Sequence, residues 1–306
     1  MAPDDAHAGD PLRDLDLRDP DAVVDALRRG AEANRSAACR RGSVDAVEAP
    51  GRLIATGDLH DNPLHLARVV RAAGRDGQAP PERRAHLTLH ELIHSDNLMN
   101  GMDFSHRALA RVAALKAAHP EFVHTLLANH ELAQVAGMGI VKNGVRVVEA
   151  FNEGLEYAFG EDAPRVDGAI REFVMSMPLA LRCRTPRGDI LCAHSIPGTA
   201  VMGRFDPSVL NRELAEADYE PRTGAAHLMV WGRHYDAEQV EDLVERWGVN
   251  LFILGHEHAE NGVEFRPPNV LVLNSDHERG VYLPIDLSDP PRAEEGVGMV
   301  VPLRRG

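Results

Sequence analysis

Short apolar runs that each stop at a polar, metal-type side chain recur along this chain. The first run, Arg52–Thr56, has a β-branched centre and is followed by Gly57, which predicts a buried strand that ends at a loop. Four later runs repeat the design and cover residues 87–91, 122–131, 190–195 and 251–258. Segments with helical spacing, such as 63–73 and 105–119, separate most of the runs. Short strands mostly separated by helices predict a layered α/β sheet.

Other patterns predict two hairpins and a helix near the N-terminus. Residues 43–56 are expected to form one hairpin around Pro50-Gly51, and residues 179–195 a second one around the turn at 185–188. Helical spacing over residues 21–39 predicts a helix that packs on the core. We therefore expect an acidic segment with a packing helix over residues 1–42, followed by one larger domain over residues 43–306.

Composition narrows the classes of function. The 306-residue chain has a net charge of −14, so its surface as a whole should repel nucleic acid and anionic membranes. A phosphate substrate would need local positive charge from metals or arginines. No apolar run approaches the roughly 20 residues that span a bilayer, and the acidic start lacks the apolar stretch of a secretory signal. The cytoplasm is therefore the expected location.

The first strand ends at candidate metal ligands. Asp58 and His60 follow it directly. Residues two apart in an extended segment point the same way, so a carboxylate and an imidazole at these positions can converge on one ion.

A second candidate site lies at residues 90–94. His90-Glu91-Leu92-Ile93-His94 matches the pattern H-E-x-x-H, which on a helix would place two histidines on zinc with the glutamate as base of a peptidase. The residues before it alternate in the manner of a strand. The competing hypothesis is that Glu91 stands at a strand end and joins Asp58 and His60.

Five motifs in this order resemble the calcineurin-like metallophosphoesterase superfamily. They are Gly-Asp-Leu-His (57–60), the carboxylate block at 90–91, Asn-His-Glu (129–131), Ala-His-Ser (193–195) and Gly-His-Glu-His (255–258). The resemblance covers about residues 52–286. Segments 177–180 and 230–233 look more like the branch that holds protein phosphatases and diadenosine-tetraphosphatase-like enzymes. The resemblance implies a four-layer α/β/β/α sandwich with two mixed sheets and two metal ions between them.

Carried over by position, the resemblance also implies seven metal ligands. The first metal ion would be held by Asp58, His60 and His258. The second would be held by Asn129, His194 and His256. Glu91 falls where the family places a bridging aspartate, and the glutamate is one methylene longer.

Three further residues receive catalytic roles from the resemblance. His130 would assist the leaving group, and Arg233 would grip phosphate oxygens. His94 stands where an aspartate usually orients the catalytic histidine. The arginine that commonly follows that aspartate is replaced by Ser95, which makes a phosphoprotein a less favoured substrate than a small or nucleotide-like phosphate.

The expected function is a dinuclear metal-dependent hydrolase that cleaves a phosphoester or phosphoanhydride. Two ions roughly 3.5–4 Å apart can lower the pKa of a bridging water and direct the resulting hydroxide at phosphorus. Nitrogen and oxygen ligands without thiolate suit Mn, Fe, Co, Ni or Zn and do not select among them. The alternatives are a zinc peptidase through residues 90–94 and a metal-binding relic with weakened catalysis.

Overall fold

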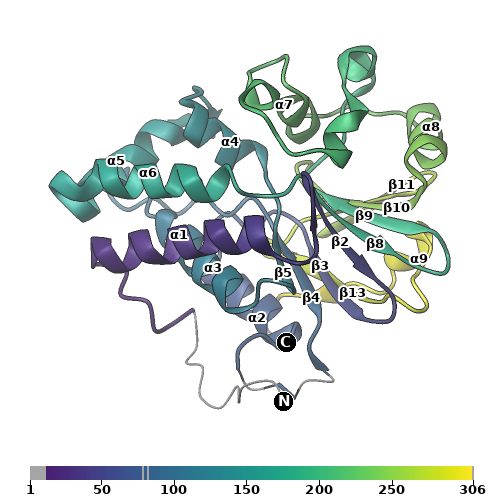
Figure 1. The fold of residues 1–306 in the computed structure, drawn as a ribbon, viewed down its shortest axis with the longest axis horizontal. Helices are drawn as coiled ribbons and strands as arrows, with labels where there is room; N and C mark the ends of the chain where they lie inside the picture. The colour runs from purple at the N-terminus through teal and green to yellow at the C-terminus, as the bar shows by residue number, and fades with distance from the viewer. Residues whose placement is uncertain (1–11, 78, 81–82, 305–306) are drawn as a thin grey trace.

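Two mixed β-sheets pack against each other in the computed structural model, which describes residues 12–77, 79–80 and 83–304 (Figure 1). The seven-stranded sheet has the order β1 (Arg40–Arg41), β2 (Val44–Glu48), β8 (Ala180–Arg184), β9 (Asp189–Ala193), β10 (Val249–Leu254), β12 (Val270–Leu273) and β11 (Val263–Arg266). The five-stranded sheet has the order β14 (Val301–Pro302), β13 (Val281–Asp286), β3 (Arg52–Thr56), β4 (His86–Leu89) and β5 (Val123–Thr125). A separate hairpin consists of β6 (Val141–Lys142) and β7 (Val145–Arg146).

Alternate residues of the central strands face the other sheet or the outer helices. In β10, Leu251 and Ile253 belong to the core between the sheets, whereas Phe252 and Leu254 belong to the larger core shared with the helices. Because both faces of such a strand are buried, its sequence is apolar throughout instead of alternating. This explains why the strands appear in the sequence as continuous apolar runs.

Helices cover the outer faces of the two sheets. The α-helices are α1 (Pro20–Ser36), α2 (Pro63–Ala72), α3 (His106–Ala118), α4 (Asn129–Ala136), α5 (Val147–Phe159), α6 (Ala163–Val174), α7 (Ala225–Val230), α8 (Ala237–Trp247) and α9 (Ala293–Gly296). Short 3-10 helices lie at Gly160–Asp162, Thr199–Arg204, Pro207–Asn211 and Glu216–Tyr219. Helices α2 and α3 contact β3 and β5 of one sheet, and α8 contacts β10 of the other. The predicted α/β/β/α sandwich is therefore confirmed.

Helix α1, drawn in purple, lies along α3 and α6 (Figure 1). It starts one residue earlier than expected, where Asp19 accepts a hydrogen bond from the backbone N–H of Asp21. The packing helix is thus present, while the proposed boundary at residue 42 stays a prediction. No described helix is long and apolar enough to cross a membrane.

The prediction of a hairpin over residues 43–56 is wrong. Strands β2 and β3 lie in different sheets, since β2 pairs with β8 and β3 pairs with β4 and β13. A Pro-Gly connection can end a strand without returning the chain beside it, so the turn residues alone did not fix the partner. The second hairpin is confirmed, because β8 and β9 pair antiparallel.

The parallel strands of both sheets end at a common edge. Strands β3, β4 and β5 are parallel in one sheet, and β9, β10 and β12 are parallel in the other. The backbone of Asp58 forms bridges to both His90 and Asn274, which follow β4 and β12 respectively. The loops after strands of the two sheets therefore meet at Asp58, and ligands of open α/β sheets bind at such carboxyl edges.

Candidate metal centre

Each candidate ligand leaves the end of a different strand or the helix that follows it. Asp58 and His60 come after β3, Glu91 after β4, and Asn129 begins α4 after β5. His194 follows β9, while His256 and His258 follow β10. Chain segments that are far apart in sequence thus deliver these side chains to one edge of the two sheets.

Several residues at this edge have an unusual backbone conformation. Nine described non-glycine residues have positive φ angles, and five of them are His60, Asp61, Glu91, His94 and His256. Such angles cost about 1–3 kcal/mol each and persist only where the surrounding structure imposes them. Their concentration here indicates that the backbone is constrained to aim side chains at a common point.

Glu91 lies between two groups of donor atoms. Its Oε1 is 2.9 Å from Nε2 of His60 and 3.6 Å from Nε2 of His130. Its Oε2 is 2.8 Å from Nε2 of His194. Each carboxylate oxygen therefore faces a different set of imidazoles, as a carboxylate that bridges two cations must.

The second group consists of Glu91, Asn129, His194 and His256. Oδ1 of Asn129 is 2.7 Å from Nε2 of His194 and 3.1 Å from Nδ1 of His256. The two imidazole nitrogens are themselves 3.1 Å apart. Donor atoms at neighbouring corners of an octahedron lie about 3 Å apart when each is about 2.1 Å from one ion. The observed separations match a shared cation.

His90 sets the tautomer of His194. Nε2 of His90 is 2.9 Å from the carbonyl oxygen of Thr56, to which it donates as N–H. Nδ1 of a neutral His90 then carries a lone pair, and it lies 3.2 Å from Nδ1 of His194. With a metal ion bound, His194 would donate from Nδ1 and keep the lone pair on Nε2 for the ion, on the side of Asn129. This is how a metal-ligating histidine is held by an outer partner.

The electrostatics of the centre favour a positive charge. Burial alone would lower the pKa of His194, but the carboxylates of Glu91 and Asp58 outweigh it and raise this pKa to about 10. Glu91 likewise outweighs the effect of burial on His60, whose pKa rises to about 9. Burial would raise the pKa of Glu91, yet the surrounding imidazoles hold it well below its ordinary value. A proton and a metal ion would be stabilised by the same carboxylates.

Of the three residues expected around the first ion, two have donor atoms close to those of other candidate ligands and one does not. Asp58, His60 and His258 all line one cavity. The carboxylate of Asp58 accepts the backbone N–H of His256 at 2.9 and 3.0 Å. His258 is exposed, its ring centroid lies 5.4 Å from that of His277, and no close group of donor atoms among the described residues includes it. The assignment of His258 stays a prediction.

His130 is held by a chain of side-chain contacts. Nδ1 of His94 is 2.7 Å from Nδ1 of His130, and Nε2 of His94 is 3.0 Å from Oε1 of Gln134. Burial lowers the pKa of His130 to about 3 and that of His94 to about 4, so both rings are neutral at pH 7. His94 donates to Gln134 and accepts from His130, and this leaves the lone pair of His130 on Nε2.

Residues 90–94 do not form the helix that a peptidase motif requires. The segment is a loop after β4. His90 contacts His194, whereas His94 contacts His130, and the described residues contain no group of close donor atoms with both. The zinc-peptidase hypothesis is therefore wrong, because a loop in which Glu91 and His94 have positive φ angles sends the two histidines to different neighbours.

Arg233 reaches the same cavity from the segment after α7. The cavity has a volume of about 550 Å³, and Arg233 lines it together with Trp231. The hydroxyl of Ser195 donates to the carbonyl oxygen of Gly232 at 2.7 Å. This bond joins the segment that carries His194 to the one that carries Arg233.

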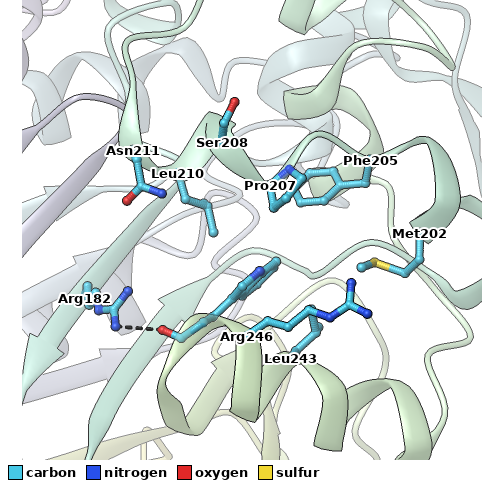
Figure 2. Close-up of a pocket in the computed structure, with 10 residues that line it drawn as sticks. Arg182, Met202, Phe205, Pro207, Ser208, Leu210, Asn211, Leu243 and Arg246 are labelled. Carbon is cyan, nitrogen blue, oxygen red and sulfur yellow. Dashed lines mark hydrogen bonds between the residues drawn. The ribbon is translucent and has the colours of Figure 1, made fainter.

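A second cavity has none of this chemistry. It has a volume of about 470 Å³ and is lined by residues of β8, α8 and the 199–211 region (Figure 2). Arg182 donates to the carbonyl oxygen of Trp247 and pairs with Asp189, so its charge is already used. No aspartate, glutamate, histidine or cysteine belongs to its described lining. The candidate metal centre is therefore at the strand-end cavity.

Sequence reasoning missed several residues of that cavity. Lys142 and Asp276 both line it, and Oδ1 of Asp276 is buried without a hydrogen-bond partner among the described residues. Asn143-Gly144, a strong hairpin turn, could have indicated the β6–β7 hairpin that carries Lys142. Gln134 was recognisable from its position one helical turn after His130, which places both on one face of α4.

The comparison with known protein families matches the part of the chain that carries the candidate metal ligands. The family model described as calcineurin-like phosphoesterase matches residues 51–260. A search of the curated proteins found no match. A serine/threonine phosphatase from Saccharomyces cerevisiae, described as similar to human phosphatase PP5, is 15% identical with a TM-score of 0.66 and covers 88% of this chain and 83% of its own. A cold-active protein-tyrosine phosphatase from a Shewanella species is 13% identical with a TM-score of 0.58 and covers 89% and 84%. At these identities the two structures show a shared fold.

Proposed function

Since the chain belongs to the calcineurin-like phosphoesterase family, we propose that it is a dinuclear metal-dependent hydrolase of phosphoesters or phosphoanhydrides. The position of Glu91 carries this proposal. Its two oxygens face separate groups of donor atoms, one with His60 and the other with His194. A site for a single ion would not need a carboxylate shared in this way.

The donor set fits the metals that the proposal requires. The groups around Glu91 offer imidazole nitrogen, carboxylate oxygen and one amide oxygen, and no thiolate. This mixture suits Mn, Fe, Co, Ni or Zn. When bound, such ions supply Lewis-acid stabilisation of a phosphoryl oxygen and a water that is acidic at neutral pH.

The protein's own residues would bind the substrate and move the proton. Arg233 is exposed in the cavity, where its planar guanidinium can hold two phosphate oxygens. His130 lies near Glu91. Because its ring is neutral in the free protein, it would first take up a proton at Nε2 beside the anionic substrate and then give that proton to the leaving oxygen. His94 would keep His130 in the tautomer with its lone pair on Nε2.

The proposed substrate is a small or nucleotide-like phosphate. The cavity volume of about 550 Å³ is within the range of small-molecule sites. Ser95 stands where the family resemblance leads one to expect an arginine, which disfavours a phosphoprotein.

The test is hydrolysis of p-nitrophenyl phosphate and bis-p-nitrophenyl phosphate after reconstitution with Mn, Fe, Ni or Zn. We expect activity with at least one metal, and its loss in Asn129→Ala and His256→Ala. Asn250→Ala is the matched control, because Asn250 is exposed at the start of β10 and bonds the backbone of Arg187. Metal binding without turnover of any phosphate compound would support the relic instead.

A further inference from the structure

The chain contains two lysines, and one of them lies at the candidate site. Lys116 is buried, and Lys142 lines the strand-end cavity from the β6–β7 hairpin. Apart from histidines, Lys142 and Arg233 are the cationic side chains in the described lining of this cavity. The same lining also holds carboxylates, so these two side chains are the groups of the protein that could contact an anionic substrate with positive charge beyond histidines and any metal ions.

The two cations act on different parts of the centre. Lys142 pairs with Asp96, two residues after His94, and His94 contacts His130. Arg233 comes two residues after Trp231, whose ring packs edge-on against that of His256 at a centroid distance of 6.4 Å. Lys142 is thus on the side of His130, and Arg233 is on the side of His256.

Lys142 is available to a ligand at little cost. Its ammonium is 3.1 Å from Oδ2 of Asp96, and the side chains of Lys142 and Asp96 are 24% and 55% exposed. Ion pairs that water reaches contribute about 0–1 kcal/mol, so a phosphate group can replace the carboxylate. Asp96 lines the cavity as well, which keeps the lysine side chain directed toward it.

We propose that Lys142 is a specificity-determining residue that binds an anionic group of the departing part of the substrate. The inference rests on the proposed function, in which His130 serves the leaving oxygen. A phosphoanhydride such as a nucleoside diphosphate has a leaving group that carries its own phosphate. The preferred substrate class is therefore phosphoanhydrides over esters whose leaving group is uncharged.

The reaction balances without an additional reactant. The oxygen of water bonds to the terminal phosphorus, and the bond from that phosphorus to the bridging oxygen breaks. The electron pair stays on the bridging oxygen, which becomes a phosphate oxygen of the departing monophosphate. Lys142 would neutralise part of the charge that develops there, and the protons of water pass to phosphate and solvent.

The test compares adenosine diphosphate with adenosine monophosphate, whose leaving group is uncharged adenosine, using Mn-loaded protein. In Lys142→Met we expect kcat/KM for the diphosphate to fall about tenfold more than for the monophosphate, the size of one charged hydrogen bond. Lys142→Arg should restore much of the difference. Arg146→Met is the matched control, because Arg146 is on the same hairpin, pairs with Glu149 and does not line the cavity. Equal losses for both substrates, or no loss, would overturn the inference.

Equilibrium binding of inorganic pyrophosphate to the same metal-loaded proteins separates this inference from the proposed function. Weaker binding in Lys142→Met but not in Arg146→Met supports an anion site at Lys142 even if the wild type hydrolyses neither nucleotide. In that case only the proposed function fails. Unchanged pyrophosphate binding in Lys142→Met overturns the anion site whether or not the enzyme is active.

Discussion

Nδ1 of His94 lies 2.7 Å from Nδ1 of His130, while Nε2 of His130 lies 3.6 Å from Oε1 of Glu91. One ring nitrogen of His130 is therefore fixed by a neutral histidine, and the other faces the candidate centre. A neutral imidazole orients a tautomer by hydrogen bonding alone, whereas an aspartate would also stabilise the imidazolium.

We predict that His94→Ala lowers kcat about 10²-fold and changes KM little, because a general acid–base group loses its orientation. Gln134→Ala should give a smaller loss in the same direction, since Gln134 accepts from His94. Steady-state kinetics on p-nitrophenyl phosphate measure both. A rise in KM with kcat unchanged would mean that His94 serves substrate binding instead.

The metal content should depend on the shared carboxylate. We expect about two metal ions per chain in the wild type and fewer than one in Glu91→Ala, because that change removes one donor from each group. Elemental analysis after dialysis measures the ratio. Glu48→Ala, an exposed glutamate at the end of β2, is the matched control and should keep both ions. A wild type that binds one ion would argue against the bridging role of Glu91.

Gly255 packs closely against residues of the candidate metal centre, so a larger side chain at this position should destabilise the fold. A Cβ added there would lie 2.2 Å from Oδ1 of Asp58 and 2.6 Å from Cε1 of His90. We predict that Gly255→Ala lowers the free energy of unfolding by about 1–3 kcal/mol, the usual effect of overpacking. Urea unfolding of the metal-free protein measures it.

Gly168→Ala is expected to have the opposite effect on stability. Gly168 lies on the exposed side of α6, and a Cβ there would meet no atom within 4 Å. Since alanine favours a helix over glycine, this variant should be about 0.5–1 kcal/mol more stable. If both variants change stability alike, the close approach at Gly255 is not what determines the loss.

The motif residues could be placed from sequence because each one ends an apolar run. Asp58 and His194 follow strands whose nearly continuous apolar character indicates burial on both faces, whereas the strand before Glu91 alternates between leucine and polar residues. Parallel strands share their carboxyl edge. Which strands pair with each other was harder to predict from the sequence. The segment Pro50-Gly51 ends β2, but only the tertiary structure decides that β3 enters the other sheet.

The directions of individual side chains explain the remaining differences between the sequence-based predictions and the structure. His94 has a φ of 61° and turns toward α4, which a motif read as helical would not allow. Lys142 sits on a two-residue strand whose sequence gives no hint that the hairpin reaches the cavity. These features depend on how separate segments pack together, and periodicity within one segment does not encode them.

A buried histidine outside the centre should make the fold sensitive to acid. His106 at the start of α3 is 1% exposed, and neither ring nitrogen has a hydrogen-bond partner among the described residues. Burial lowers its pKa from 6.5 to about 3. Below pH 6.5, therefore, His106 binds a proton in the unfolded chain but stays neutral in the folded protein. The contribution of His106 to stability is complete above pH 6.5 and declines as the pH falls toward 3, by up to about 1.4 kcal/mol per pH unit.

We predict that His106→Phe flattens this decline, because phenylalanine keeps the packing against Phe159 and cannot bind a proton. Urea unfolding of both metal-free proteins at several values between pH 3 and pH 7 gives the difference in stability, in which other titrating groups cancel. That difference should grow in favour of the variant as the pH falls. His106→Gln separates titration from packing: it should lose stability at every pH through its buried amide, yet show the same flattened slope. Parallel curves for wild type and His106→Phe would mean that His106 is not the source of the acid sensitivity.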